Sequence, residues 1–214
     1  MYTKIAESPD IQATEIVWSQ PGMDCGTGLN QFNNSFTSED GVTATVKSRM
    51  SLVTGCSDAS HTKVGFNDGE RLLVSDPRQG SIRIRLDPPV QKVWTQIAVL
   101  STRTKCDFTC TVRAIGNHGE VKDESISGST KGNTLNANVQ YVGMSCGGDK
   151  DEPIQFIEFS IDEPNANIDF FMINQLRLSM GAAETAPQAP AIAMAAGSSV
   201  PRSNPAPAPK KRNR

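Results

Sequence analysis

Hydrophobic and polar residues alternate along much of this chain with a period of two. In "GSIRIRLDPP", the apolar Ile82, Ile84 and Leu86 alternate with Arg83 and Arg85. Successive side chains of a β-strand point to opposite faces, whereas a helix repeats every ~3.6 residues. The pattern therefore predicts a strand with one face toward a core and the other toward water.

Similar segments recur at roughly ten-residue spacing and are separated by Gly, Asn, Asp and Pro. We expect strands at residues 14–18, 42–51, 70–75, 82–86, 93–99, 108–114, 135–142, 154–161 and 168–179, and a tight turn at "IGNHGEV" that leads into a further strand. No segment shows the helical period over the length of an ordinary helix. About nine or ten short strands without intervening helices predict an all-β fold, an antiparallel β-sandwich of the jelly-roll type.

The sequence predicts two parts, a body at residues 1–180 and a tail at residues 181–214. The tail holds six of the 13 prolines and no aromatic residue, so it cannot bury enough apolar surface to offset its ordering entropy and is expected to be disordered. The chain has 21 Lys and Arg residues, of which five lie in the tail and 16 in the body. It has 23 Asp and Glu residues, of which one lies in the tail and 22 in the body. Because an acidic body repels phosphate backbones, nucleic acid is expected to contact only the basic end, Lys210, Lys211, Arg212 and Arg214. The alternative is a solubilising end without a partner.

No run of about 18 apolar residues occurs, so no helix is predicted to span a membrane. The start, "MYTKIAESPDIQATEIVW", lacks the basic region, apolar run and cleavage site of a signal peptide. The sequence therefore predicts no particular cellular compartment. A virion would fit a structural protein, and an extracellular surface would fit a structural or a glycan-binding protein.

The five cysteines, Cys25, Cys56, Cys106, Cys110 and Cys146, are too few for a disulfide scaffold, and their odd number leaves at least one unpaired. Cys106 and Cys110 would lie roughly 13 Å apart along a strand, too far for a disulfide. The spacings match no zinc motif. Buried free thiols, or one or two disulfides in an oxidising compartment, both fit the sequence.

Four segments of the second half follow one another in an order that resembles a known family. They are "SIRIRLDPPVQKVWTQIAV", "CTVRAIGNHGEV", "PIQFIEFSID" and "IDFFMINQLRLS". From about residue 74 to residue 179 the chain resembles the galactose-binding-like jelly roll of many carbohydrate-binding modules and of bacterial surface proteins with exosortase sorting tails. The resemblance implies a β-sandwich that serves as a lectin-like, structural or enzyme-appended module. The chain departs from the sorted surface proteins at its end, where neither a Pro-Glu-Pro motif nor an apolar helix occurs.

The closing segment contains an asparagine among apolar residues. Every second residue gives the set Ile168, Phe170, Met172, Asn174, Leu176 and Leu178. In the carbohydrate-binding relatives an Asp on this strand helps to hold a structural calcium ion, and Asn174 occupies the matching place. Because an amide oxygen can ligate Ca²⁺ but brings no charge, the resemblance implies a weak calcium site or none. The alternative is that Asn174 bonds to backbone at a sheet edge or a bulge.

Trp94 lies on the opposite face of its predicted strand from Val93, Ile97 and Val99. An exposed ring at this position, together with Tyr141, would stack against the apolar face of a sugar. The alternative is that both faces of the strand are covered and that Trp94 belongs to the core.

The chain lacks the common catalytic motifs. Neither G-x-S-x-G nor H-E-x-x-H occurs, and "DCGTGLN" lacks the lysine and the following helix of a phosphate-binding loop. We therefore expect a module that is not an enzyme and acts through its surface. One hypothesis is a carbohydrate-binding module that uses Trp94. The other is a structural component of a particle, such as a virion decoration or surface protein, that contacts neighbouring subunits or forms a homo-oligomer.

Overall fold

The computed structural model describes residues 2–9, 13–21, 23–24, 34–47, 53–56, 66, 69–76, 80–101, 105–130, 139–147, 152–162 and 168–180, with the backbone alone at 53–56. The chain divides into two compact units, Met1–Gly181 and Ala182–Arg214. The second unit, which contains the predicted tail except for Gly181, lies outside the described residues, as do Gly181 and Cys25.

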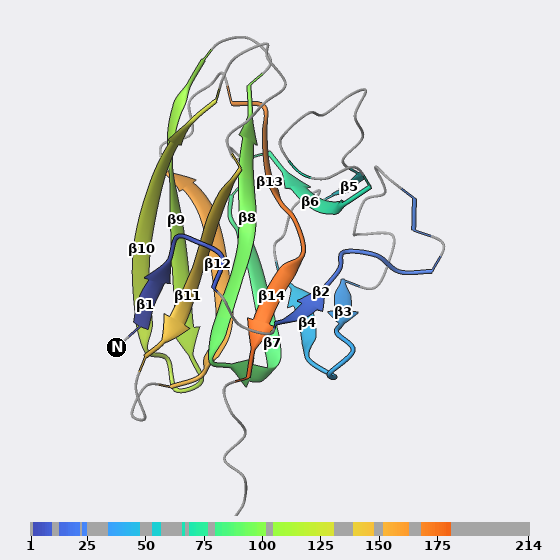
Figure 1. The fold of residues 1–214 in the computed structure, drawn as a ribbon, viewed down its shortest axis with the longest axis vertical. Coiled ribbons are helices and arrows are strands. Elements are labelled where there is room, and N and C mark those ends of the chain that lie inside the picture. Colours follow the sequence, from blue (N-terminus) through green and yellow to red (C-terminus); the bar gives the residue numbers. More distant parts are fainter. Residues whose placement is uncertain are drawn as a thin grey trace, which may run out of the picture. The chain divides into compact units, whose positions relative to one another are not determined.

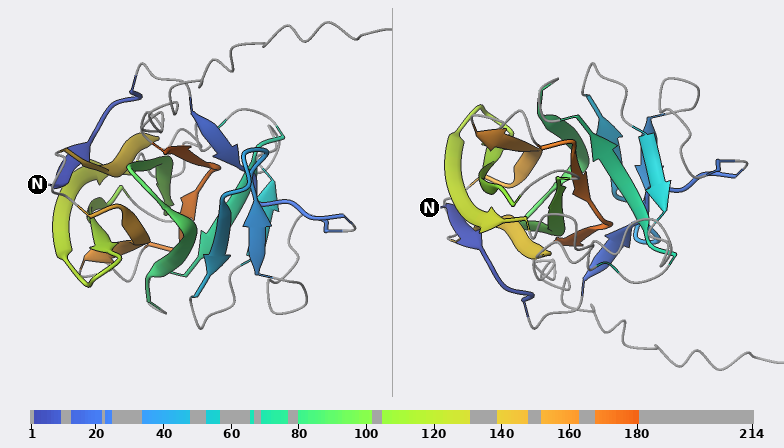
Figure 2. Two further views of the ribbon diagram at one scale, coloured as in Figure 1. Left: turned by 90° about the horizontal axis from the view of Figure 1, so that it is seen from below. Right: turned by 90° about the horizontal axis from the view of Figure 1, so that it is seen from above.

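The described part of the first unit consists of two antiparallel β-sheets (Figures 1 and 2). The eight-stranded sheet runs in the order β1 (Tyr2–Ile5), β11 (Gln140–Cys146), β8 (Lys92–Leu100), β13 (Phe170–Ile173), β6 (Arg71–Ser75) and β5 (Val53–Cys56); β14 (Leu176–Ser179) also pairs with β8, and β2 (Thr14–Ile16) pairs with β14. The six-stranded sheet runs in the order β10 (Val121–Ser129), β9 (Asp107–Gly116), β12 (Ile154–Asp162), β7 (Ile82–Val90), β4 (Thr43–Val46) and β3 (Ser35–Thr37).

This arrangement confirms the predicted all-β, antiparallel sandwich. The described residues contain no helix, so none of them forms a helix long and apolar enough to cross a membrane. The chain changes sheet from β7 to β8 to β9, and again from β10 through β11 and β12 to β13. Repeated exchange between two facing sheets is the connectivity expected of a jelly roll.

The core lies between the sheets and follows the predicted alternation. On β9, the side chains of Phe108, Cys110, Val112 and Ala114 are buried, while the residues between them face away from the core. The inner residues of β7, β8 and β12 join them in one cluster, to which Ile82, Ile84, Leu86, Val93, Ile97, Val99, Ile157, Phe159 and Ile161 belong. Burial of alternate side chains from two facing sheets is the main source of stability in a sandwich.

The sequence analysis did not predict three of the strands, and it misplaced a fourth. β1, β3 and β5 have only three or four residues, too few to establish an alternation. β11 spans Gln140–Cys146 rather than residues 135–142. Its alternation is obscured because Val142, Gly143 and Met144 are all buried.

The closing segment is interrupted at Asn174 and Gln175, between β13 and β14. Before the interruption the odd-numbered Phe171 and Ile173 point into the core, and after it the even-numbered Leu176 and Leu178 do so. The predicted single face from Ile168 to Leu178 is therefore wrong, because a bulge inserts one extra residue relative to β8 and reverses the alternation. Both halves pair with β8, but the outer partner changes from β6 to β2.

Candidate functional site

Trp94 is not an exposed platform, since only 1% of its surface is accessible. The predicted alternation of the strand is right, because Val93 and Ile97 belong to the core between the sheets and Trp94 does not. However, β8 is a central strand, and Trp94 lies between Gly143 on β11 and Arg177 on β14. The same outer face carries a second buried cluster, Phe66, Leu72, Ala98 and Met172. Both faces of β8 are covered, so the stacking role proposed for Trp94 is excluded.

Tyr141 is half-buried and faces Gln96 on the same outer surface as Trp94. It lies two residues along β11 from Gly143, the residue opposite Trp94. The structure thus brings Tyr141 and Trp94 onto adjacent strands, but it leaves only Tyr141 partly accessible.

Asn174 is satisfied within the fold, as the alternative interpretation expected. Its Oδ1 accepts a hydrogen bond from the backbone N–H of Gln96 at 2.9 Å and lies 3.0 Å from the hydroxyl of Thr95. Its Nδ2 donates to Gln96 Oε1 at 2.7 Å. Its carbonyl accepts a bond of 2.6 Å from the indole N–H of Trp18. These contacts make Asn174 the residue that holds the bulge against β8.

The described residues bring together no group of three or more His, Cys, Asp or Glu side chains that could hold a metal ion. At Asn174 a calcium ion would have to displace the Gln96 amide from Oδ1. The calcium site implied by the family resemblance stays a prediction, to be tested by titration.

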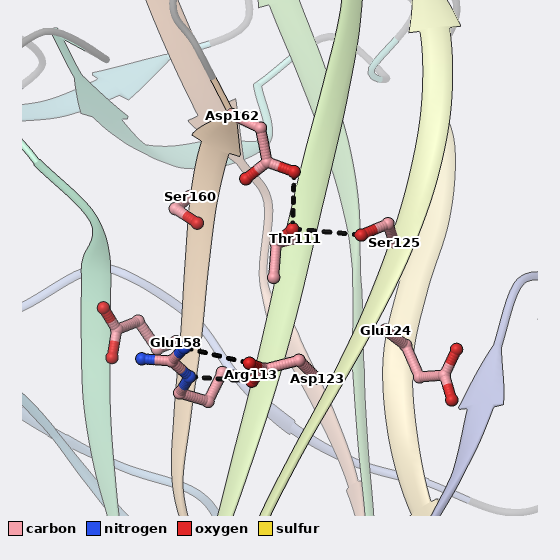
Figure 3. Close-up of a pocket in the computed structure, with 8 residues that line it drawn as sticks. All are labelled: Thr111, Arg113, Asp123, Glu124, Ser125, Glu158, Ser160 and Asp162. Carbon is pink, nitrogen blue, oxygen red and sulfur yellow. Dashed lines mark hydrogen bonds and ion pairs between the residues drawn. The ribbon is translucent and has the colours of Figure 1, made fainter.

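The outer surface of the six-stranded sheet contains a polar cavity of about 540 Å³ (Figure 3). Strands β9, β10 and β12 supply its lining, which consists of Thr111, Arg113, Asp123, Glu124, Ser125, Glu158, Ser160 and Asp162. The side chain of Glu124 points away from β9, whereas Asp123 and Ser125 of the same strand point toward it (Figure 3). We call this surface the polar face. It exists because alternate residues in the middle of β9 and in the second half of β12 are polar, while the intervening residues of these two strands are buried.

An ion pair lies at one end of the polar face. Arg113 donates from Nε to Asp123 Oδ1 at 2.7 Å and from Nη2 to Asp123 Oδ2 at 2.9 Å. The hydrogen bonds from Arg113 lower the pKa of Asp123, and the same pairing raises the pKa of Arg113. A bidentate pair of this kind neutralises the guanidinium and fixes its plane. Three further carboxylates line the cavity: Glu124, which pairs with Lys122, and Glu158 and Asp162, which leave the face with a net negative charge.

Hydroxyl groups connect the three strands at the other end of the face. The Thr111 hydroxyl donates to Asp162 Oδ2 at 2.7 Å and lies 3.0 Å from the Ser125 hydroxyl. The hydroxyl of Ser81, which precedes β7, donates to Glu158 Oε1. Each carboxylate keeps further lone pairs for a ligand, because an ionised carboxylate accepts about four hydrogen bonds.

Phe156 provides an aromatic surface on the same side of β12 as Glu158. The side chain is half-buried, and the guanidinium carbon of Arg83 lies 4.9 Å from the centre of its ring. This cation–π contact holds the ring against the sheet. Phe156 is not one of the residues that line the cavity, but it lies two positions along β12 from Glu158, which does line it.

The sequence analysis did not single out the polar face. One signal was available in the predicted strand at residues 154–161. Its apolar residues Ile157, Phe159 and Ile161 occupy alternate positions, so the ring of Phe156 had to lie on the opposite side. The pairing of Arg113 with Asp123 required the register between β9 and β10, and no single strand contains that information.

Comparisons with known proteins give little further guidance. No protein-family model matches the chain, and no curated protein is similar to it. Among solved structures, the chain is similar to the CBM22-1 xylan-binding domain of Xyn10C from Paenibacillus barcinonensis, with a TM-score of 0.36, 10% identity, and coverage of 75% of this chain and 100% of that chain. The fold is therefore assigned from the strand order and pairing, and not from this similarity.

Proposed function

We propose that the protein is a carbohydrate-binding module and that the polar face binds the glycan. The observation that carries this proposal is the cavity of about 540 Å³ with hydroxyl, carboxylate and guanidinium groups on three adjacent strands. A sugar presents many hydroxyls at similar spacing, and each both donates and accepts. Carboxylates such as Glu158 and Asp162 accept from such hydroxyls with charge-assisted hydrogen bonds.

The aromatic ring supplies the second element of sugar recognition. Phe156 lies two residues from Glu158 on the same face of β12, about 7 Å along the strand. Apolar sugar faces pack on aromatic rings, while the hydroxyls at their edges bond to flanking polar groups. A polar cavity beside a ring favours a sugar over an apolar small molecule, whose sites are mostly lined by hydrophobic groups.

The particle hypothesis finds less support in the described residues. β10 forms an edge of the six-stranded sheet and carries Lys122, Asp123 and Glu124. The ammonium group of Lys4 also donates to the carbonyl of Ser125 on this strand at 3.0 Å. Charged side chains and a covered carbonyl oppose pairing with the edge of another subunit.

Isothermal titration with soluble polysaccharides tests the proposal. Xylan, a mixed-linkage glucan and a galactomannan should be compared for the unaltered protein and the Glu158→Gln/Asp162→Asn variant. We expect at least one glycan to bind and the double substitution to weaken binding by about tenfold or more, since two charge-assisted hydrogen bonds are lost. Failure of all glycans to bind, or binding unaffected by the substitutions, would exclude the polar face.

A pair of phenylalanines provides the matched control. Phe156→Ala removes the ring beside the cavity, whereas Phe170→Ala removes an exposed ring, 44% accessible, from the eight-stranded sheet. Only Phe156→Ala is expected to weaken glycan binding. Equal effects of both substitutions would show that the ring beside the cavity has no specific role.

A further inference from the structure

A second and larger hollow lies at the other edge of the six-stranded sheet, where β2 of the eight-stranded sheet lies near the turn between β3 and β4. Its volume is about 750 Å³, and its lining comes from β2 and the residues that follow it, the turn between β3 and β4, and the end of β14. The lining residues that matter for the argument are Glu15, Val17, Glu39, Asp40 and Met180. We call this hollow the β2 groove. Figure 1 shows β2 beside β3 and β4.

Exposed apolar side chains gather in the β2 groove. Val17 is 45% accessible and Met180 is 44% accessible. They are two of the four large hydrophobic residues that are exposed in the described part of the chain, the others being Val121 and Phe170. Exposed apolar groups that share a groove with polar groups at its rim are typical of interaction sites.

The charged residues that line the β2 groove are all acidic. Its lining contains Glu15, Glu39 and Asp40 but neither Lys nor Arg. Glu15 is engaged by Arg177 Nε at 3.1 Å, whereas Glu39 and Asp40 make no ion pair with any residue that the structure describes. A partner that fills the groove must therefore bring positive charge to these two carboxylates.

The two acidic residues stand on a well-defined turn. The backbone N–H of Gly41 donates to the Ser38 carbonyl at 3.1 Å, and the N–H of Val42 donates to the Ser38 hydroxyl at 3.1 Å. Gly41 has a φ of +84°, which a residue with a side chain rarely adopts. Glu39 and Asp40 are thus presented by a preformed turn and need little ordering when a partner binds.

The third feature is an open strand edge. Within the described residues, β2 pairs with β14 on one side and with no strand on the other. Among the strands that the structure describes, none pairs with the outer edge of Thr14–Ile16, and in this part of the chain a further strand can be added there. Extended peptides bind proteins in this way, with main-chain hydrogen bonds for affinity and alternate side chains for specificity.

From these features we infer that the β2 groove binds an extended peptide segment of another protein in which basic and apolar residues alternate. The main chain of the segment adds a strand to β2. Its basic side chains face Glu39 and Asp40, and its apolar side chains pack on Val17 and Met180. This interaction is separate from glycan binding, because the polar face belongs to β9, β10 and β12.

Fluorescence anisotropy with a labelled eight-residue peptide of alternating Lys and Val tests the inference on the full chain. We expect the peptide to bind and the Glu39→Gln/Asp40→Asn variant to weaken binding by about tenfold, since two surface ion pairs are lost. The Glu158→Gln/Asp162→Asn variant is the control of equal charge change, and it should bind the peptide unchanged. Absence of binding, or equal effects of both variants, would overturn the inference.

Two further measurements distinguish the mode and the occupant. A peptide N-methylated at every second residue keeps its charge but cannot pair as a strand on that edge, so it should bind much more weakly; equal affinity would overturn strand addition. Sedimentation of the protein without peptide should be measured over a range of concentrations, for the unaltered chain and for the Glu39→Gln/Asp40→Asn variant. We expect no self-association that depends on Glu39 and Asp40. Self-association of that kind would assign the groove to a second copy of the chain and overturn the peptide partner.

Discussion

The backbone N–H of Gln96 donates a 2.9 Å hydrogen bond to the side-chain oxygen of Asn174. This bond joins the central strand β8 to the bulge between β13 and β14. At the bulge the closing segment reverses its alternation and exchanges β6 for β2 as its outer partner. One amide thus determines which side chains of the last strand enter the core, and it also positions the strand against which β2 packs.

Asn174→Ala should destabilise the protein. Asn174 is fully buried, so its removal leaves the Gln96 amide without its acceptor inside the fold. The expected loss is about 1–3 kcal/mol in the free energy of unfolding, measured by urea denaturation. Gln175→Ala changes the neighbouring, half-exposed residue of the same bulge and should cost less than about 0.5 kcal/mol. Equal losses for the two variants would contradict the role assigned to Asn174.

Calcium provides a separate test at the same residue. Because Asn174 Oδ1 already accepts a hydrogen bond from the Gln96 amide, we expect the melting temperature to be the same in millimolar Ca²⁺ and in a chelator. A rise in melting temperature with Ca²⁺ that is absent from Asn174→Ala would instead establish the calcium site implied by the family resemblance.

The sequence predicted the sandwich because alternation within a strand depends on local residues only. The inner faces of β7, β9 and β12 were obtained in this way, as was the turn after β9, where Gly119 adopts a φ of +96°. The reversal at Asn174 was missed because a bulge breaks the period without an obvious change in composition. Trp94 was assigned to the correct face, yet its burial depends on β11 and β14, which come from distant parts of the chain.

The candidate sites were harder to predict for the same reason. The polar face depends on the register of β9 against β10 and β12, and the β2 groove combines residues near 15, 40 and 180. Sequence separation hides such groupings, since strands that pair need not be adjacent in the chain.

Gly143 should tolerate no side chain. A Cβ atom at this position would lie 2.2 Å from the carbonyl oxygen of Val93 and 2.5 Å from the Cβ of Trp94, so β11 would have to move away from β8. Gly143→Ala is expected to cost about 2 kcal/mol or more in urea denaturation. At Gly128 the nearest atoms belong to the side chains of Gln140 and Phe108, which can rotate. Gly128→Ala should therefore cost less, and the reverse order would be evidence against the close approach of β8 and β11.

Cys110 should be unreactive in the folded protein. Burial, assisted by the negative charge of Asp162, raises the pKa of its thiol to about 12, so at pH 8 only about one molecule in ten thousand carries the thiolate. Site-resolved mass spectrometry after iodoacetamide treatment should find Cys110 unmodified in buffer and modified in denaturing urea. Rapid modification in buffer would show that the region between β9 and β12 opens readily.

The turn after β9 should respond to acid through Glu152. The carboxylate of Glu152 accepts hydrogen bonds from the backbone N–H of His118 and from its Nδ1, both at 2.8 Å, and these bonds lower the pKa of Glu152. A carboxyl group whose folded pKa is lowered adds stability above its ordinary pKa of 4.5 and loses it as the pH falls through the folded value. Glu152→Gln should accordingly lower the urea midpoint at pH 7, and the difference from the unaltered protein should shrink as the pH falls below 4.5. Glu120→Gln, in the same turn, serves as the control and should leave both midpoints unchanged. A deficit in Glu152→Gln that persists undiminished at pH 3 would show that the charge of Glu152 does not stabilise the turn.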